Sequence, residues 1–483
     1  MLNSLISHLQ HTLFHPDRRM ANVALGALLV ASAAGVALMV ALLGPLLAIA
    51  AALGLLAGYL ALRSPRWGLT FVILVACLLP FATFPFRLGF KPTFLDAALA
   101  AFVFVWAVGL LTGRERRFVG SPMALPVAMF LLLALFAFAL GGANARPSIT
   151  TIRRFAEILG GILLFFVIIN VVREQQDLEW AGKTVMLAGA AAALIGVIFY
   201  VIPQDWTVRV FNALGRFDYP GGAGALRFIE DDPNNPMRAI GTAIDPNTFG
   251  GMLLLFAGLT APQLFTPRPL FRRWMVVVFM GLDVLCLYLT YSRSAMVGLV
   301  VALGLIALLR YRKLLVVGLV GVALLLLLPQ AQDYVARFAA GVQGQDLATQ
   351  MRFGEYKDAL RLIARYPVFG VGFSGTPDID LYIGVSSVYL LMAEQMGLVG
   401  LAAFLSALVV FFVMFFRTVR TRLSDLRREA LLLGLGGALA GVLVSGLLDH
   451  YLFNLAYPHM VSLFWIYVGL AVAAILMERA AAE

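Results

Sequence analysis

The sequence predicts an all-α protein that crosses a membrane many times, and two observations carry this prediction. First, 61% of the 483 residues are hydrophobic and only 13% are charged, and the mean hydropathy is +0.92. Second, the apolar residues form many runs of about 20, the length a helix needs to cross a hydrocarbon core about 30 Å thick. Such runs must fold as helices or closed barrels, because lipid offers no partners for backbone polar groups. We expect about 14 transmembrane helices, within a range of about 12 to 14.

The expected spans follow the apolar runs in chain order. They lie near residues 22–42, 44–62, 67–86, 94–112, 122–141, 152–172, 184–202, 244–262, 274–291, 294–309, 313–329, 387–412, 429–447 and 458–476. The first two form one continuous run that Gly44-Pro45 divides, and this dipeptide is typical of a tight turn. Residues 1–19 are amphipathic with a basic end and lack a small-residue cleavage site, so we expect an interfacial helix rather than a cleaved signal.

Lysine and arginine residues in the short loops set the expected orientation. They gather on alternate loops, at 18–19, 63–66, 114–117, 173–183, 267–273, 310–313, 417–428 and 479. This pattern places those loops and both termini in the cytoplasm. The net charge of +10 therefore follows mainly from membrane topology, and we expect no nucleic-acid partner. Cys77 and Cys286 lie in separate apolar runs and are expected to be buried small residues.

The other basic residues fall on the outer side, where topology rules expect few. They concentrate in two long segments, and a loop of about 55 residues in a compact membrane protein is usually functional. We therefore divide the chain into a cytoplasmic or interfacial N-terminus (1–21), N-terminal transmembrane helices (22–202), an outer segment (203–243), a central group of transmembrane helices (244–329), a large outer loop (330–386), C-terminal transmembrane helices (387–476) and a cytoplasmic tail (477–483).

The stretch YLTYSRSAMVGLV, residues 288–300, places Arg293 in a strongly apolar region. An arginine at the bilayer centre costs roughly 2.5–3.5 kcal/mol, but the expected topology moves Arg293 to the outer surface, where one span ends and the next begins. An interfacial arginine whose stem lies along apolar surface would explain it. Between Ser292 and Ser294, in a turn with almost no loop, its planar guanidinium would equally suit the phosphate oxygens of a lipid headgroup.

A second basic feature lies in the large outer loop. Residues 350–366 have helical spacing and end before Pro367. One face carries Phe353, Tyr356, Leu360 and Ile363, and a basic stripe carries Lys357, Arg361 and Arg365. Arg352 stands apart from this stripe, near the helix start. An amphipathic helix lying on the membrane surface would also explain the pattern.

The loop after this helix reads GVGFSG, residues 370–375. Glycines such as Gly372 allow backbone N–H groups to approach a ligand closely. No strand precedes these glycines, which argues against a dinucleotide site.

Five further residues are candidates because of their position in the expected topology. Asp245 and Asn247 flank a proline at a helix start, with Asn247 the candidate N-cap, and Arg238 precedes them on the outer side. Glu394 falls about two turns inside a span, where a carboxylate either serves function or pairs with an arginine. His450 lies at an outer membrane edge and is either a hydrogen-bonded interfacial residue or a functional one. The sequence contains no HExxH, no carboxylate array with metal-ligand spacing and no GxSxG, so we expect no metal.

From about Arg238 to Gly400 the chain resembles the bacterial O-antigen polymerase and O-antigen ligase superfamily. The resemblance rests on GTAIDPNTFGG, LTYSRSAMVGL, the arginine that opens a loop helix followed by PVFGVG, and the spacing of YLLMAEQMGLVGL, in this order on this topology. DHYLFN and the aromatic last span also resemble polymerase members. This stretch is roughly a third of the chain.

The resemblance implies a membrane glycosyltransferase whose active site faces the periplasm. Its donor would be a glycan on undecaprenyl diphosphate, and its acceptor the hydroxyl of another lipid-linked glycan, with no cofactor. Arg293 and Arg352 match the family's diphosphate-binding arginines, and Arg238 is a weaker third. The expected catalytic residues are Arg293, Arg352, Glu394 and His450. The expected substrate-binding residues are Arg238, Asp245, Asn247, Ser292, Tyr356, Lys357, Arg361, Gly372 and Ser386. Besides membrane lipids, the expected partners are a flippase and a chain-length regulator.

One departure from the family pattern bears on the reaction. Ligase members carry a His-Asn pair before the span that follows the loop, and this chain has Ser386 and Ser387 there. The departure favours a polymerase over a ligase and leaves the proton acceptor open among Glu394, His450 and Asp245. A lipid-glycan transporter is a third interpretation. It would need charges along a transmembrane path, whereas the charged residues here gather on one side.

Overall fold

The computed structural model describes residues 18–87, 89–113, 118–326, 343, 347–375 and 384–482. Most of the predicted interfacial helix over 1–19 and the basic run at 114–117 lie outside the described residues. So do 327–342, 344–346 and 376–383, which make up much of the predicted large outer loop. The chain divides into two compact units, residues 1–63 and 64–483, and each is described by itself.

The described part of the first unit is the helix α2 (Arg18–Arg63). It is interrupted at Gly44, whose φ of 76° and ψ of 164° are not helical. Glycine tolerates a positive φ, and Pro45 is well placed as the first residue of the helical stretch that follows. The division falls at the dipeptide that the sequence predicted.

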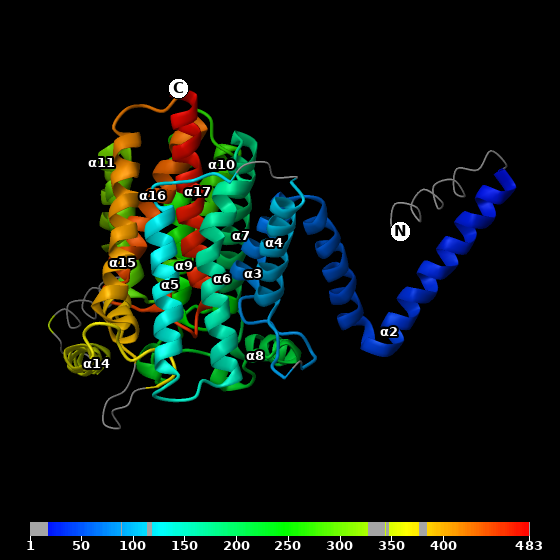
Figure 1. The fold of residues 1–483 in the computed structure, drawn as a ribbon, viewed down its shortest axis with the longest axis horizontal. Coiled ribbons are helices and arrows are strands. Elements are labelled where there is room, and N and C mark those ends of the chain that lie inside the picture. Colours follow the sequence, from blue (N-terminus) through cyan, green and yellow to red (C-terminus); the bar gives the residue numbers. More distant parts are fainter. Residues whose placement is uncertain are drawn as a thin grey trace. The chain divides into compact units, whose positions relative to one another are not determined.

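The second unit is a bundle of helices (Figure 1). Its longer helices are α3 (Pro65–Leu78), α4 (Phe94–Leu111), α5 (Ala124–Gly141), α6 (Ile149–Val171), α7 (Gln175–Val201), α8 (Gln204–Leu214), α9 (Pro246–Thr260), α10 (Arg273–Leu289), α11 (Arg293–Leu309), α12 (Lys313–Leu326), α14 (Leu347–Arg365), α15 (Val388–Val419), α16 (Leu426–Ser445) and α17 (Pro458–Ala482). Each predicted span contains a helix. Among the described residues, the only β-structure is two isolated bridges.

Seven helices in the described part of the chain are long and apolar enough to cross a membrane: α4, α5, α6, α7, α15, α16 and α17. The helices α3 and α11 are apolar but shorter. These findings confirm the predicted all-α polytopic membrane protein. The expected span 67–86 was too long, because α3 ends at Leu78. The residue before a proline avoids the helical region, and Leu79 precedes Pro80.

The core of the bundle lies around α16 and α17. In the most apolar 18-residue stretch of each helix, 83% and 89% of the residues are buried. The helix α16 packs against α9 and α11, and α17 packs against α6. Gly298 of α11 and Gly441 of α16 meet so closely that a Cβ on Gly298 would lie 2.6 Å from the carbonyl oxygen of Gly441. Small residues at such crossings let two helix backbones approach within a membrane.

The two ends of this bundle differ. One end, the α14 face, carries α8, α14 and the connections before α9 and after α16 (Figure 1). The other end, the C-terminal face, carries the end of α17 and the turns between α6 and α7, α11 and α12, and α15 and α16. The loops at 173–183, 310–313 and 417–428, which the charge pattern assigned to the cytoplasm, therefore lie together at the C-terminal face.

Candidate active site

Asp449 is the centre of a hydrogen-bonded cluster on the α14 face. It is only 4% exposed, and its backbone carbonyl accepts the N–H of Val388 over 2.9 Å. Its Oδ1 accepts the backbone N–H of His450 over 2.9 Å, and its Oδ2 accepts Ser294 Oγ over 3.5 Å. Through its carboxylate and its backbone carbonyl, Asp449 therefore joins the start of α11, the start of α15 and the chain that follows α16.

His450 lies half-buried beside this carboxylate. Its Nδ1 is 3.4 Å from Asp449 Oδ1, and its ring centroid is 6.1 Å from that of Tyr457. Burial lowers the pKa of His450, but the carboxylates of Asp449, Asp245 and Glu355 outweigh it and raise the pKa above its ordinary value. A raised pKa makes the neutral imidazole a stronger proton acceptor.

The turn between α10 and α11 presents Arg293. Ser292 is 1% exposed and is the N-cap residue of α11, and its N–H donates to Thr290 Oγ1 over 3.2 Å. A Cβ on Gly250 of α9 would lie 2.9 Å from Ser292 Cβ, so α9 packs directly against this turn. Arg293 is half-buried in the first turn of α11, where the sequence predicted that one span ends and the next begins.

Two residues without the freedom of glycine hold positive φ angles beside the site. Tyr291 has φ 54° and precedes Arg293 by two positions, and Ile244 has φ 64° and precedes Asp245. For a β-branched residue such as isoleucine this conformation is an outlier that costs of order 1–3 kcal/mol. Strain of this kind concentrates at functional sites, where the surrounding packing maintains it.

Arg238 binds the same turn from the segment before α9. Its Nε donates to the carbonyl oxygen of Thr290 over 2.8 Å, and its Nη2 donates to Asn247 Oδ1 over 2.7 Å. The N-cap of α9 is Asp245, whose Oδ1 accepts the N–H of Thr248 over 2.7 Å. The prediction that Asn247 caps this helix was wrong, because its side-chain oxygen accepts from Arg238 instead.

The helix α14 confirms the predicted loop helix and docks onto the site through two adjacent residues. Tyr356 Oη donates to the carbonyl oxygens of Ser386 and Leu447 over 3.1 and 3.4 Å. Glu355 Oε2 accepts both the N–H and the Oγ of Ser386, over 2.9 and 2.7 Å. Burial raises the pKa of the Tyr356 hydroxyl. The charge of Arg352 lowers this pKa, and the carboxylates of Glu355 and Asp449 raise it. The charges of Arg352 and Asp449 both act on the Tyr356 hydroxyl.

The residues predicted to share the apolar face of this helix differ from their neighbours in how far they are exposed. Phe353 and Leu360 are 58% and 59% exposed, whereas Ala359 and Leu362 are buried. The hydrogen bonds of Glu355 and Tyr356 turn α14 so that this pair faces the bundle. Lys357 and Arg361 are exposed on the outer side of α14, and Arg361 pairs with Asp358 over 3.1 Å.

Gly372 packs against the protein itself. A Cβ there would lie 2.4 Å from Gly141 Cα in α5, and its N–H donates to the carbonyl oxygen of Gln395 over 3.0 Å. The helix α15 is broken at Gly397, where φ is 68°, and the break allows the carbonyl of Gln395 to accept a hydrogen bond from outside the helix. Glu394 lies buried just before this break, with the carboxylates of Glu355 and Asp358 as charged neighbours.

Sequence reasoning did not select Glu355 or Asp449 as site residues. Nothing in the local sequence marks Glu355 apart from other polar positions of an amphipathic helix. Asp449 had one signal, its place beside His450 at a span end. Within the described residues, no group of three histidine, cysteine, aspartate or glutamate side chains is arranged to hold a metal ion.

Residues 275–405 match a protein-family model, that of the O-antigen ligase domain Wzy_C. This match covers less than half of the chain and supports the resemblance to the O-antigen ligase and polymerase superfamily. The matched segment carries Arg293, Arg352, Glu355 and Ser386, while Asp449 lies outside it. None of the curated proteins compared with the chain matches it. The family and the apolar helices together describe a multi-pass bacterial membrane enzyme of the glycosyltransferase type in O-antigen biosynthesis.

Proposed function

We propose that the protein is a glycan polymerase. It transfers a growing glycan from undecaprenyl diphosphate to a hydroxyl of a lipid-linked repeat unit, in the assembly of O-antigen or exopolysaccharide. The proposal places the protein in the inner membrane with the α14 face toward the periplasm. The observation that supports it is the cluster on that face, where the buried Asp449 contacts Ser294, the neighbour of Arg293, and lies beside His450.

Each residue of this cluster has a role in the proposed transfer. The acceptor oxygen attacks the anomeric carbon, and the bond from that carbon to the diphosphate oxygen breaks with its electron pair going to the diphosphate. Arg293 and Arg352 supply fixed positive charge where negative charge develops on the leaving group. His450, beside Asp449, takes the proton of the acceptor hydroxyl, a role that a raised pKa favours.

The remaining site residues support this arrangement. Arg238 and Asn247 fix the turn that carries Arg293, and Ser292 begins its helix. Ser386 and Tyr356 anchor α14 and so position Arg352. Asp245 faces His450 as one of the charges that raise its pKa. Glu394 is a second candidate proton acceptor within the same proposal, deeper in the protein.

Polymerase is favoured over ligase by the residue at position 386. The family's ligases are expected to carry a His-Asn pair here, and Ser386 instead uses its hydroxyl and N–H to bind Glu355. The position therefore serves to dock α14 in this chain. The alternative is a ligase that passes finished glycan to lipid A-core or to protein.

The decisive experiment gives the purified enzyme a single substrate, a lipid-diphosphate repeat unit. A polymerase makes a ladder of longer lipid-linked glycans from it. A ligase makes none until lipid A-core or acceptor protein is added. In a strain that lacks the gene, single repeats accumulate if the protein is a polymerase, whereas long unattached polymer accumulates if it is a ligase.

A further inference from the structure

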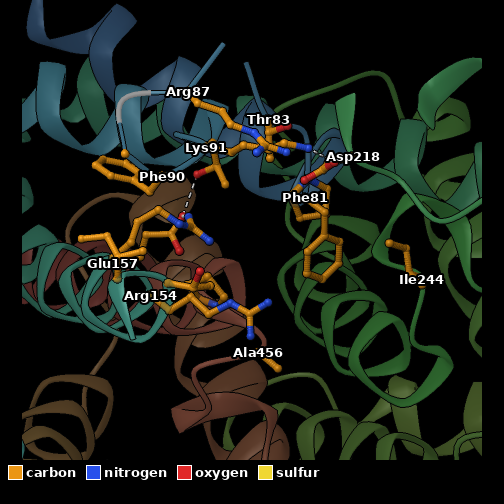
Figure 2. A pocket seen from close by; sticks show the side chains of 17 residues that line it. Phe81, Thr83, Arg87, Phe90, Lys91, Arg154, Glu157, Asp218, Ile244 and Ala456 are labelled. Carbon is orange, nitrogen blue, oxygen red and sulfur yellow. Dashed lines mark hydrogen bonds and ion pairs between the residues drawn. The ribbon is translucent and has the colours of Figure 1, made fainter. Parts of the chain in front are cut away.

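A polar cavity lies on the α14 face, outside the segment that matches the family model. Its volume is about 390 Å³, and four of its basic residues are Arg87, Lys91, Arg153 and Arg154. Arg87 and Lys91 come from the loop between α3 and α4, and they face Arg154 and Glu157 of α6 across the cavity (Figure 2). Basic side chains that converge from two elements on one hollow are suited to an anion.

Two of these cations are held by acids of the protein. Lys91 forms an ion pair with Asp218. Arg153 Nη1 lies 3.1 Å from Asp96 Oδ2 and 3.0 Å from Glu157 Oε1. Arg87 and Arg154 make no hydrogen bond or ion pair within the described residues. The cavity therefore keeps two guanidinium groups whose donors are available to a ligand.

The floor of the cavity is a fixed polar network with one acceptor left over. Thr93 Oγ1 donates to Glu157 Oε1 over 2.6 Å and accepts the N–H of Asp96 over 2.9 Å. Glu157 is 3% exposed, and its Oε2 has no hydrogen-bond partner among the described residues. A buried carboxylate oxygen without a donor is costly. A ligand hydroxyl that reached this oxygen would satisfy it.

An apolar groove of about 640 Å³ continues from the cavity along α4 and α6. The groove and the cavity share Phe90, Ile149, Arg153 and Glu157 as lining residues. The groove is lined further on by side chains such as Leu99, Val103 and Leu163. A basic cavity that opens into an apolar groove between two membrane helices fits a lipid whose headgroup carries phosphate.

The cavity also adjoins the candidate active site. Its lining includes Ile244, which precedes Asp245, and Ala456, which precedes Tyr457. Tyr457 stacks edge-on against His450, with ring centroids 6.1 Å apart. A glycan attached to a lipid in the groove would therefore extend toward His450 along the surface of the same face.

We propose that this cavity and groove bind a second lipid-linked glycan, the acceptor of the transfer. Its phosphate oxygens contact Arg87 and Arg154, a hydroxyl of its first sugar donates to Glu157 Oε2, and its hydrocarbon chain follows the groove between α4 and α6. This inference rests on the proposed polymerase function, because a polymerase must hold two lipid-linked substrates at once. It assigns the acceptor to the N-terminal half of the chain and leaves the donor diphosphate to Arg293 and Arg352.

Photo-crosslinking of the full-length protein tests this inference. The protein is placed in phosphatidylcholine nanodiscs with a diazirine-bearing polyprenyl diphosphate sugar, and the adducts are mapped to peptides. The wild type is expected to give adducts in α4 or α6 and, separately, near α11 or α14. The double variant Arg87→Ala/Arg154→Ala should reduce the α4 and α6 adducts roughly tenfold or more and keep the others. An unchanged yield at α4 and α6 would overturn the inference.

Two controls make the result specific. Arg146→Ala removes an exposed arginine of the same face that does not line the cavity, and it should leave both sets of adducts unchanged. Arg87→Lys/Arg154→Lys keeps the charges and should retain most of the α4 and α6 adducts. Loss of these adducts in either control would count against the proposed contacts.

The same measurement separates this inference from the proposed function. Arg293→Ala should remove only the adducts near α11 and α14, and failure of that result would count against the donor site alone. Excess phosphatidylglycerol should not displace the probe from α4 and α6. If it does so as readily as unlabelled probe, the groove is a site for bulk phospholipid and the assignment to a substrate is overturned.

Discussion

The two ends of the bundle use arginine in different ways. On the C-terminal face, four arginines pair with acids of other helices: Arg66 with Asp177, Arg310 with Glu429 over 2.9 Å, Arg427 with Glu179 over 3.0 Å, and Arg428 with Glu478 over 2.9 Å. On the α14 face, Arg153 also pairs with Asp96 and Glu157, whereas Arg87 and Arg154 have no such acid within the described residues.

This difference separates two roles of positive charge in one protein. Charge neutralised by an acid on another helix holds the helices together and has little left for a ligand. Charge that no acid of the protein neutralises keeps a field that attracts an anion. The four paired arginines of the C-terminal face therefore serve helix packing, and Arg87 and Arg154 of the α14 face remain available to an anion.

The strongest test of the comparison is Arg293→Ala. If this arginine stabilises the leaving diphosphate, glycan transfer by the purified enzyme should fall roughly 10²–10³-fold, with the unfolding temperature little changed. Arg146→Ala, on the same face but outside both sites, is the matched control. Transfer within about threefold of the wild type in the Arg293 variant, measured on the same scale, would remove the donor site from this face.

On the opposite face, Arg310→Ala should act on stability instead. Glu429 is 2% exposed, and Arg310 also donates to the carbonyl oxygens of Val419 and Thr421, so its removal leaves a buried carboxylate and two carbonyls without their donor. The expected loss is about 3 kcal/mol, seen as earlier thermal unfolding in detergent. The specific activity of the folded fraction should stay near that of the wild type. A fall in activity without a change in stability would contradict the division between the two faces.

A smaller loss of activity is expected for Arg352→Ala on α14. This arginine reaches the site from a helix that docks through its neighbours Glu355 and Tyr356, so its contribution is roughly 10–100-fold in transfer rate. Arg361→Ala is the control on the same helix, because Arg361 points outward and pairs with Asp358. Equal losses in the two variants would indicate a general effect of the charge on α14 rather than a contact with the diphosphate.

The test with the smallest expected effect concerns the pH dependence of glycan transfer. Asp449 is one of the carboxylates that raise the pKa of His450. If neutral His450 accepts the proton, the rate falls as pH drops through that pKa. Asp449→Asn lowers this pKa, so the acid limb of the rate profile should move to lower pH by about one unit. An acid limb that does not move would exclude His450 and leave Glu394 as the candidate proton acceptor.

Much of the fold could be predicted from the sequence because a membrane span is a local property. Whether 20 residues form a transmembrane helix depends on their own composition, so every predicted span contains a helix and the bend at Gly44 falls where the dipeptide indicated. The placement of Arg293 at a turn and the extent of α14 followed from the same local patterns.

The site could be predicted only in part, because its contacts join residues far apart in the chain. Ser294 meets Asp449 across 155 positions, and Asn144 meets the loop before α15 across 227. Such contacts depend on which helices pack together and on the rotation of each about its axis, and small shifts in either would change the partner. The sequence by itself determined a helical membrane protein with its basic residues sorted between two sides. The tertiary structure alone decided that Asp245 caps α9, that Glu355 docks α14, and that Arg87 and Arg154 face one cavity, because packing register sets which side chains meet.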